Sequence, residues 1–249
     1  YDNPGQGLPS NSGLMLVFSQ KTGILQAILF DEGYLTDVRT AVAGQIVTKY
    51  LAPANISSIG IFGTGIQARM QVSYLKEITN CRKVMAWGRS DAGLADYKIT
   101  MERDGFQVET TRDAEEGASN CNLLITATPS QQPLIFAEMI RPGTHITAMG
   151  SDTSDKQELD PRILQRADLV IADSIAQCLE RGEISKALMA GLITQDIVLE
   201  LGNIIRGQDS RRSSDEQITV ADLTGVAVQD IQIAKAVCAE LLGPSPESK

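Results

Sequence analysis

The sequence predicts an α/β fold: a doubly wound, parallel sheet covered by helices on both faces, together with a smaller second domain. Through the middle of the chain, short apolar runs alternate with helical patterns. Each run is apolar throughout and not only at every second residue, which is typical of strands buried on both faces. A glycine-rich turn follows the first of these runs, whereas the two ends of the chain have a different pattern.

Composition narrows the class of protein. The chain has 249 residues, of which 43% are hydrophobic and 21% are charged, so a folded core is expected. Its net charge of -9 argues against a nucleic-acid-binding surface. The sequence has no apolar run as long as a membrane span and no recognisable signal peptide. We therefore expect a cytoplasmic protein that binds neither nucleic acid nor membrane.

Cysteine and histidine usage argues against a metal site. The four cysteines lie far apart without a C-x-x-C pair, which favours free thiols in a reducing compartment. The single histidine, His145, lies in an apolar run and is interpreted as a packing residue of a strand. We expect no metal ion.

The elements follow in order. Residues 13–19 and 24–30 are apolar runs around a Gln20–Gly23 turn and predict a hairpin. An apolar stripe over 35–51 predicts a helix. Six further strands are predicted, at 56–62, 83–87, 106–109, 121–127, 145–149 and 169–172. Three helices are expected between them, one starting near Ile66 and the others at 91–103 and 113–118.

The end of the chain predicts a helix over 196–206, a strand over 217–223 and a last helix over 225–242. We expect this tail to pack on the opening hairpin. The predicted domains are thus a discontinuous α+β substrate and dimerisation domain, 1–38 with 217–249, and a dinucleotide-binding domain, 39–216. The chain opens at Tyr1 in a loop-like run, so we expect the smaller domain to lack residues that precede it.

The turn after the first buried strand has the pattern of a dinucleotide-binding loop. Residues 59–62 lead into Gly63-Thr64-Gly65-Ile66-Gln67-Ala68, and a helix follows. The first glycine permits a tight turn, the second lets the backbone approach a pyrophosphate, and Ala68 allows close helix packing. Amide groups and the helix dipole would hold the phosphates. This context predicts a Rossmann-type domain with a nicotinamide cofactor.

The end of the second strand bears on the choice between NAD and NADP. An acidic residue there would bind the ribose 2′-hydroxyl of NAD. This chain has Arg89 and Ser90, whose donors suit a 2′-phosphate, so the sequence leans to NADP. In the alternative interpretation Arg89 is a solvated surface residue and Asp91 binds the ribose of NAD.

Asp152 is the candidate acid or base. It follows the strand at 145–149, and ligands of open α/β sheets lie beyond the carboxyl ends of their strands. A carboxylate beside a nicotinamide ring could move a proton during hydride chemistry at a carbon bound to nitrogen. A helix or turn cap is the alternative, and position alone does not separate the two.

Four motifs together resemble the ornithine cyclodeaminase/mu-crystallin family over nearly the whole chain. They are L-T-D-V-R-T-A at 35–41, G-T-G-I-Q-A-R at 63–69, A-M-G-S-D at 148–152 with K-Q-E-L at 156–159, and D-L-T-G-V-A-V-Q-D at 222–230. Their wording is most similar to the branch tied to ectoine utilisation. The cyclodeaminases proper differ from this chain at Gly88 and at Leu223-Thr224, and the resemblance leaves the substrate open.

The resemblance implies roles for individual residues. Asp152 would be the catalytic acid or base, and Arg39 and Thr224 would contact the substrate. Contacts to the cofactor are implied for Ser10, Arg39, Gly63, Thr64, Gly65, Ile66, Gln67, Thr126, Thr128, Met149, Gly150, Lys156 and Leu223, besides Arg89 and Ser90. An arginine and a lysine that bind the substrate carboxylate are expected upstream of Tyr1.

The activity implied is hydride transfer at the α-carbon of a small amino acid or cyclic imino acid, as in the cyclodeamination of ornithine or a related diamino acid. The alternatives are an imino-acid reductase or alanine-type dehydrogenase, and a non-catalytic NADPH-binding protein similar to mu-crystallin. Members of the family form dimers, so a homodimer is expected.

Overall fold

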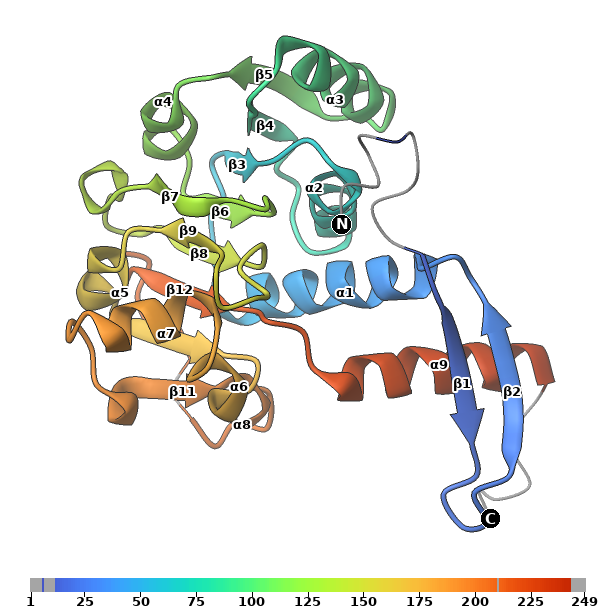
Figure 1. The fold of residues 1–249 in the computed structure, drawn as a ribbon. Helices are drawn as coiled ribbons and strands as arrows, with labels where there is room; N and C mark the ends of the chain where they lie inside the picture. The colour runs from blue at the N-terminus through green and yellow to red at the C-terminus, as the bar shows by residue number, and fades with distance from the viewer. Residues whose placement is uncertain (1–5, 7–11, 210, 243–249) are drawn as a thin grey trace. The chain divides into compact units, whose positions relative to one another are not determined.

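The computed structural model describes residue 6, residues 12–209 and residues 211–242 (Figure 1). The chain divides into two compact units, one made of 1–40 with 226–249 and the other of 41–225. In the described part of the chain, no helix combines the length and the apolar character needed to cross a membrane.

The larger unit is built on an eight-stranded sheet in which every neighbouring pair is parallel. Its order is β11-β10-β12-β8-β6-β3-β4-β5 (Figure 1). The strands are β3 (Ile59–Phe62), β4 (Lys83–Trp87), β5 (Gln107–Thr111), β6 (Leu123–Thr126), β8 (His145–Ala148), β10 (Leu169–Ala172), β11 (Val198–Glu200) and β12 (Thr219–Asp222). The predicted α/β class and parallel sheet are confirmed.

Helices cover both faces of this sheet, because alternate side chains of each strand enter two separate cores. In β3, Ile59 and Ile61 join one core and Phe62 joins the other. The first face is covered by the second half of α1 (Tyr34–Leu51), α2 (Ile66–Tyr74), α3 (Asp91–Arg103) and α8 (Leu201–Ile205). The second is covered by α4 (Ala114–Ser119), α5 (Arg162–Arg166), α6 (Ile175–Cys178) and α7 (Gly182–Met189).

Burial on both faces explains why the strands are apolar throughout. A small parallel pair, β7 (Gln131–Ile135) with β9 (Gln157–Leu159), also packs on the second face, to which it contributes Ile135 and Leu159. Single 3-10 turns lie at Leu75–Glu77, Ala137–Met139 and Gln195–Ile197.

The strand order creates a switch point between β3 and β6. From β3 the chain proceeds to β4 and β5 on one side, whereas β6 and β8 extend the sheet on the other. The residues that follow β3 and β6 therefore lie side by side at the carboxyl edge of the sheet. This is where open α/β sheets bind their ligands.

Two expectations about the end of the chain were wrong. The strand β12, which the sequence grouped with the smaller domain, lies between β10 and β8 in the large sheet, where it pairs with both neighbours and all four of its residues are buried. Residues 196–206 were expected to form one helix. Instead Val198–Glu200 pairs with β10 as β11, and only Leu201–Ile205 is α-helical, since pairing at the sheet edge outweighs helix propensity.

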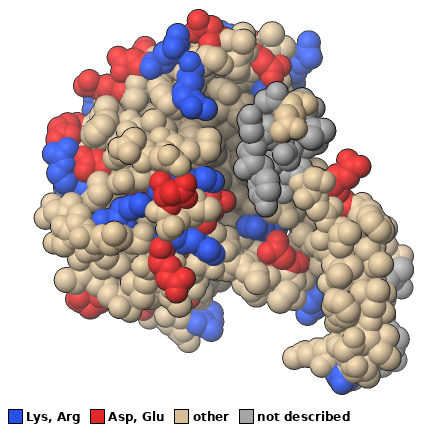
Figure 2. Space-filling view, viewed as in Figure 1, with Lys and Arg blue, Asp and Glu red and all other residues tan. Residues whose placement is uncertain are grey.

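The smaller unit contains the predicted hairpin and the last helix. β1 (Leu14–Phe18) pairs antiparallel with β2 (Leu25–Phe30), and α9 (Ala227–Leu242) belongs to the same unit. Directly opposed residues share one face of a hairpin. One face is formed by the opposed pairs Leu14 with Phe30, Leu16 with Ile28, and Phe18 with Leu25, and all six side chains are exposed. In the view of Figure 2, the surface over the hairpin has few charged side chains.

Candidate functional site

The turn after β3 requires glycine at its first position. Gly63 has a φ of +121°, and its amide donates to the Trp87 carbonyl at 3.0 Å. A Cβ atom at Gly63 would lie 2.7 Å from the carbonyl oxygen of Ala127, which follows β6. The backbone after β3 is therefore pressed against the backbone after β6, as a tight dinucleotide turn at the switch point requires.

The second glycine of the turn faces open space. Gly65 is exposed in an ordinary extended conformation (φ -78°), and nothing lies within 4 Å of a Cβ atom built there. It is the N-cap residue of α2, provides no side-chain cap, and precedes a first turn without acidic residues. The positive end of the α2 dipole is thus accessible at Gly65 and Ile66, and a diphosphate fits there.

The turn after β4 carries the residues considered for the adenine ribose. Arg89 is exposed, whereas the Ser90 hydroxyl caps α3 by accepting from the Gly93 amide at 3.2 Å. Asp91 is exposed and lies 3.8 Å from the Arg112 guanidinium. Gly88 is buried, and a Cβ atom there would lie 2.9 Å from Thr64 Cγ2. A side chain at position 88 would therefore require the Thr64 side chain to shift.

On the other side of the switch point, one buried carboxyl group joins the turns after β6 and β8. Glu158, on β9, accepts hydrogen bonds from the Thr126 hydroxyl at 2.6 Å and from the amide and hydroxyl of Thr128, both at 2.7 Å. It also accepts from the Gly150 amide at 2.8 Å. Three residues expected to contact the cofactor thus meet at a glutamate to which the sequence analysis assigned no role.

A second buried carboxyl group holds the residue before Asp152. Glu183, near the start of α7, accepts from the Ser151 hydroxyl and from the amides of Glu158 at 2.7 Å and Leu159 at 3.1 Å. Burial, with a smaller contribution from the neighbouring Glu158, raises the pKa of Glu183 to about 7. Asp222 lies close by and accepts from the Ile184 amide at 2.8 Å. Burial, followed by the nearby Glu183, raises the pKa of Asp222 well above its ordinary value.

Asp152 itself is accessible. Its side chain is 54% exposed, and one carboxylate oxygen lies 2.6 Å from the Lys156 ammonium. The contacts of Asp152 do not support the alternative of a turn cap, because its carboxylate accepts a hydrogen bond from Lys156 and not from a backbone amide of the described residues. Asp152 is thus a carboxylate on a loop fixed by Glu158 and Glu183, and its own side chain is free to meet a ligand.

The remaining predicted residues near this edge are buried. Met149 and Leu223 donate their amides to the carbonyls of Thr126 and Ala148, which continues the pairing of the strands beyond their ends. The Thr224 side chain is 5% exposed, and its hydroxyl donates to Asp173 at 3.1 Å and accepts from Gln177 at 2.7 Å. Both hydrogen bonds of this hydroxyl are made within the protein, and the expected contact of Thr224 with the substrate stays a prediction.

Two predicted residues do not belong to the described part of the larger unit. Arg39 belongs to the smaller unit, where its guanidinium lies 3.1 Å from the Asp230 carboxylate and 3.0 Å from the Gln229 side-chain oxygen. Its role in holding phosphates or a substrate carboxylate stays a prediction. Ser10 lies outside the described residues.

His145 has the packing role expected from the sequence. Its ring is fully buried between the hydroxyls of Thr219 at 2.8 Å and Thr147 at 3.1 Å. Burial, with the nearby Arg212 guanidinium, lowers the pKa of His145 to about 3, so the ring is neutral. A group of three or more metal-ligating side chains is absent from the described residues.

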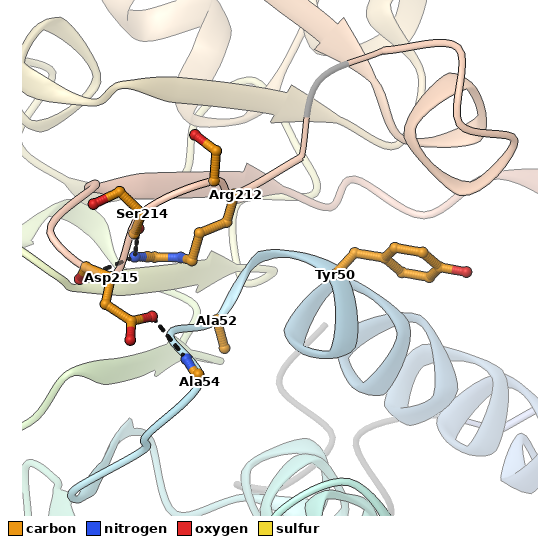
Figure 3. A pocket seen from close by; sticks show the side chains of 7 residues that line it. Tyr50, Ala52, Ala54, Arg212, Ser214 and Asp215 are labelled. Carbon is orange, nitrogen blue, oxygen red and sulfur yellow. Dashed lines mark hydrogen bonds between the residues drawn. The ribbon is translucent and has the colours of Figure 1, made fainter.

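A cavity of about 340 Å³ lies away from this site (Figure 3). It is lined by the segment that precedes β3 and the segment that precedes β12, at the amino ends of the strands. Its one guanidinium, that of Arg212, already donates to carbonyls of Leu51, Thr144, Ser214 and Asp215. The guanidinium of this cavity is therefore engaged by the backbone of the protein itself.

The sequence model of the ornithine cyclodeaminase/mu-crystallin family matches residues 1–244. The chain belongs to this family. A relative named uncharacterized cyclodeaminase y4tK, from Sinorhizobium fredii, is 41% identical over 237 residues, which are 94% of this chain and 71% of the relative.

Solved structures of the family share this fold. An archaeal alanine dehydrogenase dimer with bound NAD has a TM-score of 0.90 and 38% identity, over 96% of this chain and 74% of that one. A pyrroline-2-carboxylate reductase from Thermococcus litoralis, in complex with NADH and L-proline, has a TM-score of 0.90 and 29% identity, over 97% of this chain and 75% of that one.

Sequence reasoning missed the buried acids. Glu158, Glu183 and Asp173 support the loops at the carboxyl edge, and each meets partners that are far away along the chain. One local signal existed: Glu158 stands next to Leu159 in a short strand, where a charged residue without a function is unexpected.

Proposed function

We propose that this protein is an enzyme that uses a nicotinamide dinucleotide to transfer hydride at the α-carbon of a small amino acid or its imine. The observation that carries the proposal is the pairing of the open turn at Gly65 with an accessible carboxylate, Asp152, across the same switch point. Membership of a family whose relatives include NAD-dependent enzymes of amino and imino acids supports it.

Each side chain has a definite part in this scheme. Backbone amides at Thr64 to Gln67 bind the diphosphate at the start of α2. The nicotinamide ring supplies or accepts the hydride. Asp152 moves the proton at the substrate nitrogen, so that an amine loses one proton and one hydride to become an imine, or the reverse. Lys156, at 2.6 Å, holds the Asp152 carboxylate in place.

The net reaction we favour is an oxidoreduction, the interconversion of an amine and an imine. Both solved relatives with a TM-score of 0.90 are named for reactions of this kind. Cyclodeamination of ornithine or a related diamino acid is the second candidate, and the 41% identity to a protein named as a cyclodeaminase favours it. There the imine is attacked by the side-chain amine of the substrate, ammonia leaves, and the ring imine is reduced again.

The experiment that separates these reactions follows the cofactor and ammonia together. With pyruvate and ammonia, or with pyrroline-2-carboxylate, an oxidoreductase consumes NAD(P)H in proportion to product. With a diamino acid, a cyclodeaminase releases ammonia without net change in NAD(P)H. Asp152→Asn should lower either turnover about 10²- to 10⁴-fold, the usual contribution of an acid or base. Full turnover in this variant would refute the role of Asp152.

We propose further that the cofactor is NADP. Exposed Arg89 stands just after the end of β4, and position 88 is a glycine and not an acid that would repel a 2′-phosphate. Arg89→Gln should weaken binding of NADPH at least tenfold and leave NADH unchanged. Arg103→Gln, an exposed arginine at the other end of α3, is the matched control. If the wild type binds NADH more tightly than NADPH, the choice of NADP is wrong, whereas the proposed reaction is unaffected.

The apolar face of the hairpin supports a homodimer. We propose that Leu16, Phe30 and the other four side chains of that face pack against a second copy, because exposed apolar patches of this kind mark association surfaces. Phe30 is 80% exposed in the single chain. Phe30→Glu should shift the sedimenting species from dimer to monomer, whereas Ile99→Glu, on exposed α3, should not. A monomeric wild type would refute this.

A further inference from the structure

Glu158 is a buried carboxyl group without a cation. Its side chain is fully buried, and within the described residues none of the ion pairs includes it. Four hydrogen bonds, from Thr126, Thr128 and Gly150, take up its two oxygens. Burial raises the pKa of Glu158, although these hydrogen bonds oppose that shift. A core that only had to be stable would favour an apolar residue here.

The surroundings are shaped to admit this carboxyl group. At Gly150 a Cβ atom would overlap the Thr128 carbonyl oxygen and would lie 2.5 Å from Glu158 Cδ. The glycine of A-M-G-S-D is therefore required by the approach of Glu158 to the backbone. Thr126 directs its hydroxyl, and Thr128 its hydroxyl and amide, toward the same two oxygens.

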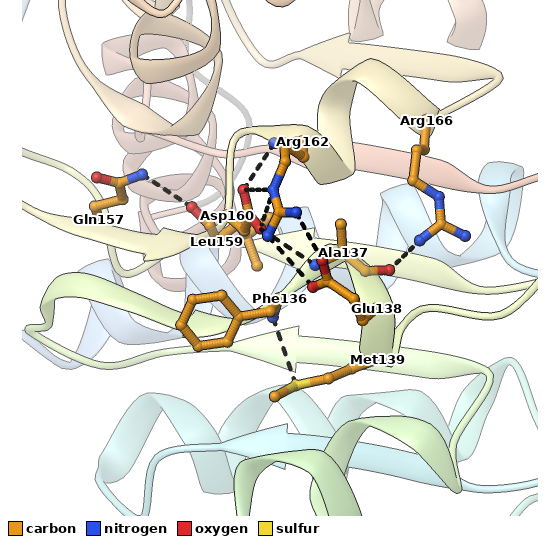
Figure 4. A network of polar contacts seen from close by, with 9 residues as sticks. All are labelled: Phe136, Ala137, Glu138, Met139, Gln157, Leu159, Asp160, Arg162 and Arg166. Carbon is orange, nitrogen blue, oxygen red and sulfur yellow. Dashed lines mark hydrogen bonds and ion pairs between the residues drawn. The ribbon is translucent and has the colours of Figure 1, made fainter.

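The strand that carries Glu158 is anchored on both sides. Glu183 accepts from the amides of Glu158 and Leu159. Immediately after β9, Asp160 accepts from the Arg162 guanidinium, which also binds Glu138 at 2.6 Å (Figure 4). Figure 4 shows Arg162 between the two carboxylates. Glu158 is thus a fixed point to which the turns after β6 and β8 are attached.

These two turns lie on the nicotinamide side of the switch point. In a doubly wound sheet the first turn binds the diphosphate and the end of the second strand binds the adenine ribose, so the other half of the dinucleotide extends over the strands beyond the switch. Here those strands are β6 and β8. The hydrogen bonds of Glu158 are therefore all made to the strands and turns on this side of the switch point.

We propose that Glu158 is a positioning residue for the nicotinamide half of the cofactor: it fixes the turns after β6 and β8 so that the ring is held toward Asp152. This inference rests on the proposed function. A residue that merely stabilised the fold would affect both halves of the dinucleotide equally, and this difference can be measured.

The test compares whole cofactors with fragments that lack nicotinamide. Wild type and Glu158→Gln are titrated with NADH and ADP-ribose, and with NADPH and 2′-phospho-ADP-ribose. In the variant the side-chain amide nitrogen, itself a donor, replaces one of the two oxygens and must face a backbone N–H that donates to the wild-type carboxyl group. We expect the dissociation constants of NADH and NADPH to rise at least tenfold, about 1.4 kcal/mol, and those of the two fragments to stay within twofold.

Three further variants sharpen the result. Glu109 is an exposed glutamate on β5, and Glu109→Gln should leave the dissociation constants of the whole cofactors and of the fragments unchanged. Gly150→Ala should reproduce the effect of Glu158→Gln, because its methyl group would displace the carboxyl group. Glu158→Asp keeps the charge and should recover part of the affinity for the whole cofactor, with fragment binding showing that each variant remains folded.

Two results would overturn the positioning role: equal weakening of cofactor and fragment in Glu158→Gln, or unchanged binding of both. A wild type that binds neither the whole cofactors nor the fragments would instead refute the proposed function. Wild-type binding of both, with an insensitive Glu158→Gln variant, would leave the proposed function standing and remove Glu158 from it.

Discussion

Gly65→Ala should separate cofactor binding from folding. The residue has φ -78° and ψ -172°, which alanine adopts without strain, and nothing lies within 4 Å of the added methyl group. Replacing glycine by alanine at such a position stabilises a protein by about 0.4–1 kcal/mol through the unfolded state. Because Gly65 is the N-cap residue of α2 and alanine is a poorer N-cap than glycine, this gain is offset, and we expect the melting temperature to change by less than about 4 °C.

The same methyl group would stand where a diphosphate must approach the amides at the start of α2. Loss of one hydrogen bond to a charged group costs roughly 1.5–3 kcal/mol. The dissociation constant of NADPH or NADH should therefore rise about 10- to 100-fold. Fluorescence titration measures the affinity, and circular dichroism measures the melting curve of the same sample.

Gly63→Ala is the matched comparison on the same turn. Its φ of +121° excludes alanine, and the methyl group would lie 2.7 Å from the Ala127 carbonyl oxygen. Strain of this kind costs about 1–3 kcal/mol, so this variant should melt at a lower temperature. If Gly65→Ala binds NADPH and NADH as the wild type does, the turn does not hold a diphosphate and the reasoning fails.

Three other predictions concern pH and the Asp152 loop. Because the pKa of His145 is lowered to about 3, burial of its neutral form makes a stability difference of roughly 5 kcal/mol, which is fully present above pH 6.5 and is lost as the pH falls toward 3. The free energy of unfolding should therefore depend less on pH over this range in His145→Gln. The pKa of Glu183 is raised to about 7, so its effect on stability has the opposite sign: the stabilisation is complete below about pH 4.5 and is lost as the pH rises through 7. Glu183→Gln should therefore make the free energy of unfolding less dependent on pH between about 4.5 and 7. The same pH dependence in the variant and the wild type would contradict a buried, protonated Glu183. Lys156→Met should lower turnover no more than about fivefold, because an exposed ion pair such as Lys156 with Asp152 is worth roughly 0.2–1 kcal/mol. A loss of turnover as large as that of Asp152→Asn would mean that Lys156 acts on the reacting atoms directly.

Local pattern was sufficient for most of the sheet and for the dinucleotide turn. The continuous apolar runs predicted β3, β4, β6, β8 and β10, because strands buried on both faces leave no other pattern. The strand, turn and helix around 63–68 were predicted as well, because a G-x-G-x-x-A pattern between an apolar run and a helical pattern is a local signal. Gly63 meets the Ala127 backbone, and Gly65 faces open space.

What the sequence could not predict depends on distant partners. Val198–Glu200 is too short for its periodicity to distinguish strand from helix, and pairing with β10 decides it. Glu158 and Glu183 receive hydrogen bonds from residues up to 32 positions away along the chain. No local spacing reveals such a contact. The place of β12 between β10 and β8 likewise follows from its pairing with these two distant strands and not from its own sequence.

A crystal structure of the protein grown with NADPH or NADH tests the central claim most directly. Diphosphate oxygens should lie about 3 Å from backbone nitrogens of the turn between Thr64 and Gln67, a hydrogen-bond distance. The pyridine ring should lie against the turns after β6 and β8, with its reactive carbon facing the Asp152 carboxylate. Density for the dinucleotide at any other place, or a ring directed away from Asp152, would contradict it.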